Sequence, residues 1–182
     1  ADPTWGTLSL WLPLYLTRER GMDLKQIALF AWLPFLAADF GCIFGGLIAA
    51  RLQKQFGTTI VNARRWAFTG GAFMMLSMSF VGFVESPYAA IALLSLGGFA
   101  HQTLSVTVIT MSSDLFRKNE VATAAGMAGT LGNAGLLGFS LLMGGLVASI
   151  GYAPFFVCLG FLDLIGAAIL WTVVRDPQAT AS

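Results

Sequence analysis

Apolar residues fall into six stretches along this chain, separated by short polar loops. The stretches run over residues 5–16, 27–50, 66–84, 88–113, 121–150 and 153–174. Five of them are long enough to cross the ~30 Å hydrocarbon core of a bilayer, which takes about 20 residues of helix. The first is short because the chain begins inside it, and we expect its helix to lack the N-terminal turns.

Backbone hydrogen bonding indicates that these segments are helices rather than strands. N–H and C=O groups inside a bilayer must pair within the protein, and the ~10-residue segments of alternating polarity that form membrane barrels are absent from the sequence. Composition agrees, since 57% of residues are hydrophobic, 10% are charged and mean hydropathy is +0.77. The predicted fold class is an all-α polytopic membrane protein, a single six-transmembrane-helix bundle over residues 1–182.

Basic residues gather in alternate loops, which predicts the orientation. Seven of the ten lie on one side of the predicted bundle: Arg51, Lys54, Arg64, Arg65, Arg117, Lys118 and Arg175. The other three follow the first segment, where two acidic residues dilute them. The positive-inside rule therefore places the loops at 51–65 and 114–120 and the C-terminus in the cytoplasm. We expect an integral protein of a bacterial inner (plasma) membrane.

Signatures of covalent or cofactor chemistry are missing from the sequence. Cys42 and Cys158 both lie in apolar stretches, so neither a disulfide framework nor a metal site is indicated. No GxSxG, HExxH, P-loop or nucleotide-binding fingerprint occurs. We therefore expect no enzyme activity, cofactor, metal or nucleic-acid partner, and the lipid bilayer as the surroundings.

Five polar side chains lie at predicted membrane depth, where they are costly and mark candidate functional sites. They are Asp39, His101, Gln102, Asn133 and Asp163, each about ten to thirteen residues into its segment and so near the bilayer midplane. No lysine or arginine occurs at this depth. An anion bound here would therefore meet no cation from this chain.

His101 shares a helical face with Ser105 and Gly97, and Gln102 lies about 100° round the helix. This face is a candidate cavity wall, with His101 as a hydrogen-bond donor or as a protonation site near neutral pH. It could equally form interhelical hydrogen bonds that hold the bundle together.

Asn133 lies in a glycine-rich stretch from Gly126 to Gly138. Glycines allow close approach of a neighbouring helix or a ligand, and they allow the helix to bend. An amide offers two donors and an acceptor, which suits recognition of hydroxyl or carboxylate groups, and structural bonding is the alternative. Thr130, three residues earlier, is a weaker candidate.

The two aspartates at predicted membrane depth, Asp39 and Asp163, have different expected roles. Asp39 is a candidate carrier of a coupling proton, because burial favours the neutral form of a carboxyl group. Hydrogen bonding to a neighbouring helix is its favoured role. Asp163 is expected to be structural, because no other polar group shares its helix face.

The first segment carries an aromatic run of Trp5, Trp11 and Tyr15, with Pro13 able to kink it. Aromatic rings can stack on a sugar ring or anchor a helix at the membrane interface. Both roles stay open for the tryptophans, whereas Tyr15 is expected to be an anchor at the outer interface.

Several short motifs run through these segments. They are Ala1-Asp2-Pro3-x-Trp5, WLPLYL at 11–16, ALFAWLPFLAAD at 28–39, Gly45-Gly46, GGFAHQ at 97–102 and GYAP at 151–154. With these motifs the chain resembles the C-terminal half of a major facilitator superfamily transporter of the anion:cation symporter family, and within it is similar to hexuronate transporters. The resemblance spans essentially all 182 residues and makes the six segments helices 7–12 of a twelve-helix fold.

The resemblance implies a site shared by two halves. The first and fourth segments would line the cavity, the second and fifth would flank it, and Asn133 would touch substrate. The N-terminal six-helix half would supply the substrate-binding arginine and the main proton-coupling carboxylates. One departure lies at residues 45–51, where alanine replaces the aspartate of the family's cytoplasmic-loop signature and argues against the usual charge-relay gate.

We predict half of a secondary active transporter that carries a hexuronate or related sugar acid together with a proton, by rocker-switch alternating access. The predicted substrate-binding residues are Asn133, Gln102, His101, Trp5, Ser105, Thr130 and Trp11, and the proton-coupling candidates are His101 and Asp39. One rival is a symporter or facilitator for aldonate, aldarate or another organic anion. Another is a non-transporting membrane receptor or assembly subunit. An intramembrane enzyme is less favoured, because no paired catalytic residues share a helix face.

Overall fold

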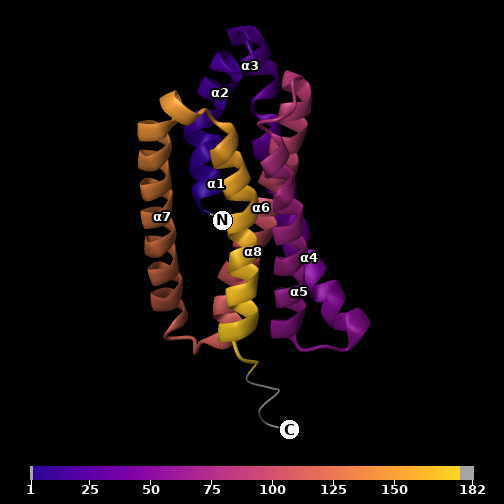
Figure 1. The fold of residues 1–182 in the computed structure, drawn as a ribbon. Coiled ribbons are helices and arrows are strands. Elements are labelled where there is room, and N and C mark those ends of the chain that lie inside the picture. Colours follow the sequence, from indigo (N-terminus) through magenta and orange to yellow (C-terminus); the bar gives the residue numbers. More distant parts are fainter. Residues whose placement is uncertain (1, 177–182) are drawn as a thin grey trace.

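The computed structural model describes residues 2–176, which form helices joined by short turns and contain no strand. The elements are α1 (Asp2–Gly6), η1 (Thr7–Trp11), α2 (Leu12–Arg18), α3 (Leu24–Phe30), α4 (Leu33–Phe56), α5 (Ile60–Met75), η2 (Leu76–Phe80), α6 (Pro87–Leu115), α7 (Val121–Ile150) and α8 (Ala153–Val173). Successive segments run in opposite directions, so that the α4–α5 and α6–α7 turns lie at the same end as the end of α8 (Figure 1). The expected all-α architecture is confirmed for this part of the chain.

Four helical spans in the described residues are long and apolar enough to cross a membrane. They are Leu24–Phe56, Pro87–Leu115, Val121–Ile150 and Ala153–Val173. The first and third predicted segments are instead built from shorter pieces, because α1 is joined to α2 through η1 and α5 continues into η2.

The predicted boundary between the second and third segments was wrong. The loop expected at 51–65 shrinks to three residues, since α4 continues to Phe56 and α5 begins at Ile60. Gly57 ends α4 in a left-handed conformation with φ 59°, which glycine adopts without steric cost. Thr59 begins α5, where its side chain accepts a hydrogen bond from the Asn62 N–H at 3.3 Å. Basic residues had suggested a loop, but their long side chains are compatible with helix ends near a membrane surface.

The kink expected at Pro13 takes the form of a π-helical turn just before it. The N–H of Leu12 bonds to the carbonyl of Thr7, five residues back, at the end of η1. Proline has no N–H to continue the helical ladder and its ring crowds the preceding turn, so a wider turn relieves the clash.

Helices α4 and α6 pack closely because small residues face each other. A Cβ atom placed on Gly41 would lie 2.8 Å from the carbonyl carbon of Phe99, so only glycine fits there. The hydroxyl of Thr103 donates to the carbonyl of Gly41 at 3.1 Å. Membrane helices commonly associate through such small-residue contacts and interhelical hydrogen bonds.

Tyr15 is buried rather than lipid-facing, which corrects its expected role as an interfacial anchor. Its hydroxyl donates to the carbonyl of Val81 at 2.9 Å and accepts from Arg20 Nε at 2.8 Å. Its ring packs edge-on against Phe156 at 4.9 Å and against Tyr152 at 5.3 Å. Burial raises the pKa of Tyr152, which lies in the turn before α8. These contacts join α2, η2 and α8 at one end of the bundle.

Polar contacts connect the helices at the opposite end of the bundle. Arg64 of α5 forms a salt bridge with Asp114 of α6 and donates to the hydroxyl of Thr110 at 2.7 Å. The guanidinium of Arg65 lies 5.2 Å from the ring centre of Trp171 in α8. Helices α5, α6 and α8 are therefore tied together by two adjacent arginines.

We expect Asp114→Asn to lower the free energy of unfolding by about 1–2 kcal/mol, because it removes a partly buried charge-assisted hydrogen bond. Thermal melting followed by circular dichroism in detergent micelles measures the change. Glu85→Gln is the matched control, since Glu85 is exposed in a turn at the other end of the bundle. Equal midpoints for the two variants would contradict a stabilising role for the Arg64–Asp114 pair.

Candidate functional site

Two predicted site residues, Trp5 of α1 and His101 of α6, lie against each other. Their rings are stacked, with centroids 5.7 Å apart and an interplanar angle of 15°. Phe35 of α4 packs edge-on against Trp5 at 5.5 Å. Helix α1 thus brings an aromatic side chain to the point where α4 and α6 meet.

The predicted wall around His101 is a packed face rather than an open one. His101 is only 2% exposed. One turn before it, a Cβ atom on Gly97 would lie 2.8 Å from Cγ of Met78. Trp5 is only partly buried, so its indole ring rather than the imidazole is the group that a ligand would reach.

Gln102 and Ser105 lie on α6 close to this stack and are both partly exposed. Within residues 2–176, neither side chain is engaged in a hydrogen bond. A primary amide and a hydroxyl in this state retain their full capacity to bind a polar ligand.

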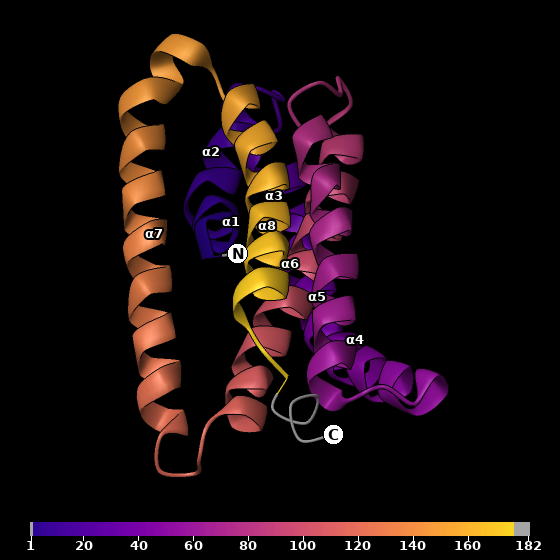
Figure 2. The same ribbon diagram turned by 60° about the horizontal axis from the view of Figure 1, so that its bottom comes forward.

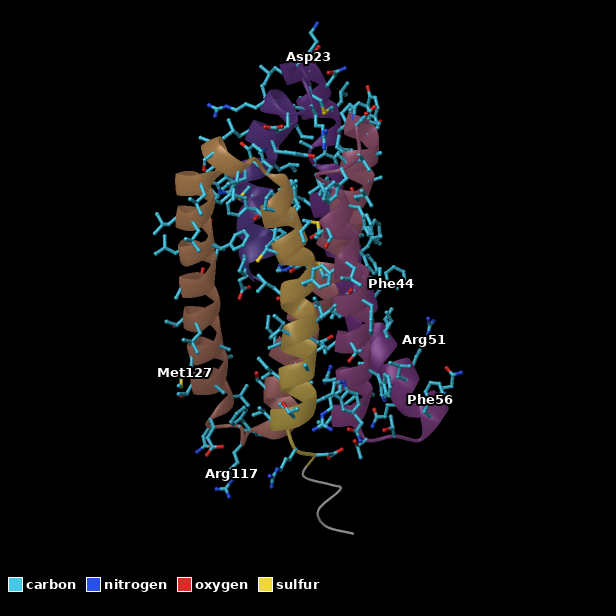
Figure 3. The ribbon with its side chains drawn as sticks, in the orientation of Figure 1. Asp23, Phe44, Arg51, Phe56, Arg117 and Met127 are labelled. Carbon is cyan, nitrogen blue, oxygen red and sulfur yellow. The ribbon has the colours of Figure 1, made fainter. Side chains whose placement is uncertain are left out.

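Asn133 and Thr130 lie on an exposed stretch of α7. The amide of Asn133 donates to the carbonyl of Gly129 at 2.8 Å, and the hydroxyl of Thr130 donates to that of Gly126 at 2.9 Å. Both side chains keep an oxygen that can accept a hydrogen bond. Thr130 also lines a hollow of about 470 Å³ together with Thr123, Gly126, Met127 and Leu131, and Met127 points away from the bundle (Figure 3).

Asp2 was not predicted as a site residue from the sequence. In the structure it lies against the glycine-rich part of α7. A Cβ atom on Gly132 would sit 2.8 Å from Cγ of Asp2, so the carboxyl group contacts the backbone next to Asn133. One turn further, a Cβ atom on Gly6 would lie 2.7 Å from Cγ of Leu136. The Ala1-Asp2-Pro3 motif carried a signal for this residue, but the apolar stretch was taken to begin at Trp5.

Helix α1 therefore has two contact faces. Trp5 faces α6 and α4, whereas Asp2 and Gly6 face α7. This arrangement connects the Trp5–His101 stack with the region of Asn133. The expectation that glycines permit close approach is met at Gly132, and a Cβ atom on Gly126, Gly129, Gly135 or Gly138 would have no neighbour within 4 Å.

The other predicted residues lie apart from this region. Trp11 rests over Gly144, with ring atoms 3.5 Å from the Cβ position there, which is about 16 Å along α7 from Asn133 at 1.5 Å per residue. Asp39 lies on the exposed face of α4, away from the face that packs on α6. Asp163 is buried in α8, 3% exposed.

The chemistry available near α1 is aromatic, amide and hydroxyl, with one carboxyl group. In the part of the chain that the structure describes, no group of three or more His, Cys, Asp or Glu side chains could hold a metal ion. These groups suit the hydroxyls and the apolar ring face of a polyol. A negatively charged ligand would need its counter-charge from elsewhere.

Comparison with known proteins agrees with the helical architecture. A sequence profile of the Major Facilitator Superfamily matches residues 4–182. The chain is 44% identical to the hexuronate transporter of Escherichia coli (strain K12) over 179 residues, which are 98% of this chain and 41% of the relative. The galacturonate transporter of Dickeya chrysanthemi is 44% identical over 92 residues, 50% of this chain and 27% of the relative.

A more distant relative extends this group. The D-galactonate transporter of Escherichia coli O6:H1 is 27% identical over 176 residues, 97% of this chain and 40% of the relative. The chain thus spans about two fifths of the length of the relatives that it matches along its whole extent. These relatives are named as transporters, in agreement with the expectation that the protein is not an enzyme.

The resemblance inferred from the short motifs is confirmed. The superfamily profile covers nearly the whole sequence, and the apolar helices have the lengths that a membrane protein requires. The chain belongs to the Major Facilitator Superfamily.

Proposed function

We propose that this chain forms the six-helix C-terminal half of a symporter that carries a hexuronate or a related sugar acid together with a proton. The observation that carries the proposal is the joint placement of Trp5 and Asn133 by the two contact faces of α1. The names of the relatives, a hexuronate and a galacturonate transporter, support the substrate class.

Each side chain has a role that its chemistry suits. Trp5 stacks on the apolar face of the sugar ring, supported from behind by His101. The amides of Asn133 and Gln102 bind ring hydroxyls, with Ser105 and Thr130 as further hydroxyl partners. The substrate carboxylate is bound by an arginine of the proposed N-terminal half, because a lone charge at this depth requires a partner.

Helix α7, which carries Asn133 and Thr130, has few contacts with the rest of this chain. Met143 is the one buried residue of α7, and Figure 2 shows this helix at the edge of the bundle. In the proposed mechanism the two halves rock about a midplane site, with α7 and the π-helical turn η1 adjusting as the site opens to each side. The end of the bundle at which α8 finishes faces the cytoplasm of a bacterial cell.

His101 and Asp39 are the proposed carriers of the coupled proton in this half. They occupy different surroundings, since His101 lies beneath Trp5 whereas Asp39 lies on the exposed face of α4. Protonation of His101 would change its stacking on Trp5 and so link the proton to the substrate-binding ring. Asp39 would act only where the proposed N-terminal half covers that face.

A transporter of an aldonate is the second candidate function. It is favoured by the similarity to a D-galactonate transporter over 97% of the chain. Aldonates lack the closed ring that Trp5 would stack on. The two substrate classes are separated by measuring uptake of galacturonate in the presence of competing galactonate.

We expect Asn133→Ala and Gln102→Ala each to lower glucuronate or galacturonate uptake at least about tenfold, the effect of losing hydrogen bonds to a buried polar ligand. Radiolabelled uptake is measured in cells that express the protein with its proposed N-terminal half. Asn119→Ala is the matched control, because Asn119 lies exposed in the α6–α7 turn. Unchanged uptake by both site variants, at normal membrane levels, would remove these amides from the site.

We expect His101→Gln to flatten the pH dependence of uptake, because glutamine cannot take up a proton as an imidazole does. Uptake rates at a series of external pH values test this expectation. A profile that keeps the shape of the unmodified protein would exclude His101 as a proton carrier and leave Asp39 as the remaining candidate.

We expect Gly132→Ala to reduce uptake, because the added methyl group displaces the Asp2 carboxyl and separates α1 from α7. Gly135→Ala is a matched control, since a Cβ atom there has no neighbour within 4 Å and both changes raise helix propensity equally, by about 1 kcal/mol. Equal uptake by the two variants would mean that the α1–α7 contact has no role in transport.

A further inference from the structure

We propose that an anionic phospholipid binds at the corner between α4 and α5, a role separate from the proposed transport activity. A hollow of about 580 Å³ lies at this corner, lined by Leu52, Phe56, Thr58 and Trp66. Pockets for small ligands and cofactors span about 300–1,000 Å³, so the hollow can accept part of a lipid molecule. Its lining is apolar apart from one hydroxyl.

The walls of the hollow are exposed aromatic rings. Phe56 is 68% exposed and Trp66 is 58% exposed. Leu52 and Phe56 are four residues apart and form one wall from the last turns of α4. The other wall is held in place, because Trp66 packs edge-on against Trp171 at 5.2 Å and Trp171 donates to the hydroxyl of Thr69 at 2.9 Å.

The end of α4, which carries Leu52 and Phe56 of this hollow, leaves the bundle. Figures 1 and 2 both show the last turns of α4 diverging from the other helices near the α4–α5 turn. In Figure 3, Arg51 and Phe56 extend outward from this part of the helix. Because Phe56 and Trp66 are largely exposed, the hollow is accessible from the surroundings of the bundle where α4 ends.

Charge selects the kind of lipid. Arg51 and Lys54 are exposed on the last turns of α4, and neither makes an ion pair with any residue between 2 and 176. No acidic residue occurs in the sequence from 40 to 84. Arg51 and Lys54 do not line the hollow, but they lie on the same last turns of α4 as Leu52 and Phe56. Their long side chains can therefore meet a negatively charged headgroup at the helix end while its acyl chain occupies the hollow, whereas a zwitterionic lipid brings no net charge to them.

The neighbouring arginines, Arg64 and Arg65, are engaged in contacts within the protein. Arg64 is engaged by Asp114, and Arg65 lies over Trp171 and donates to Asn62 at 2.9 Å. Of the four bases near this corner, the structure thus leaves Arg51 and Lys54 available for a headgroup.

Quenching of Trp66 fluorescence by acyl-brominated lipids tests the proposal. The protein is placed in vesicles of phosphatidylcholine and phosphatidylglycerol with either lipid brominated, and the Trp66 signal is the difference between the protein and its Trp66→Phe variant. We expect brominated phosphatidylglycerol to quench Trp66 more than brominated phosphatidylcholine at equal mole fraction. Arg51→Gln and Lys54→Gln should each lower this preference up to about fivefold, as expected for one base near an anionic surface.

The double variant Arg117→Gln with Lys118→Gln is the matched control, because it removes two exposed bases from the α6–α7 turn. It should leave the lipid preference at Trp66 unchanged. Equal quenching by the two lipids would overturn the proposal. So would a preference that survives the loss of Arg51 and Lys54, or one that the control variant lowers to the same extent.

Discussion

The contacts of the short helix α1 determine where the candidate site lies. One face of this helix stacks Trp5 on His101, and the other places Asp2 against the backbone of Gly132. Stacking requires a flat neighbour and backbone contact requires a glycine, so both faces depend on particular residues. Helix α1 therefore links the Trp5–His101 stack to the part of α7 that carries Asn133.

The distribution of charge follows from the cost of placing ions in a bilayer. Ion pairs and cation–aromatic contacts occur at the two ends of the bundle, with Arg20 at one end and Arg64 and Arg65 at the other. The central region carries amide, hydroxyl and aromatic groups and the carboxyl groups of Asp2, Asp39 and Asp163. An unpaired cation at that depth would be costly without a bound anion, and the proposed second half is the natural place for one.

Hydrophobic patterning predicted much of the fold. The last two helices begin and end within one residue of the predicted stretches, because turn residues and charges border them clearly. The third segment was placed too late, since Arg64 and Arg65 were assigned to a loop. The η1 turn also escaped prediction, because a π-helical turn leaves no distinct hydrophobic period.

For the candidate site, the sequence identified several of the residues but not how they lie relative to one another. His101, Trp5 and Asn133 stood out because polar and aromatic groups are rare at membrane depth. Their mutual placement depends on how α1 crosses α6 and α7, which no periodicity encodes. Asp2 was not predicted because it precedes the first apolar stretch. The burial of His101 depends on its stacking against Trp5, which the sequence pattern does not reveal.

Accumulation of glucuronate or galacturonate in liposomes tests the central claim most directly. The protein is reconstituted with its proposed N-terminal half, and a pH gradient is imposed with the alkaline side inside. We expect the sugar acid to accumulate above its external concentration, and a protonophore to abolish the accumulation. Measurable binding of the sugar acid without any gradient-driven accumulation would contradict the account of a proton-coupled symporter.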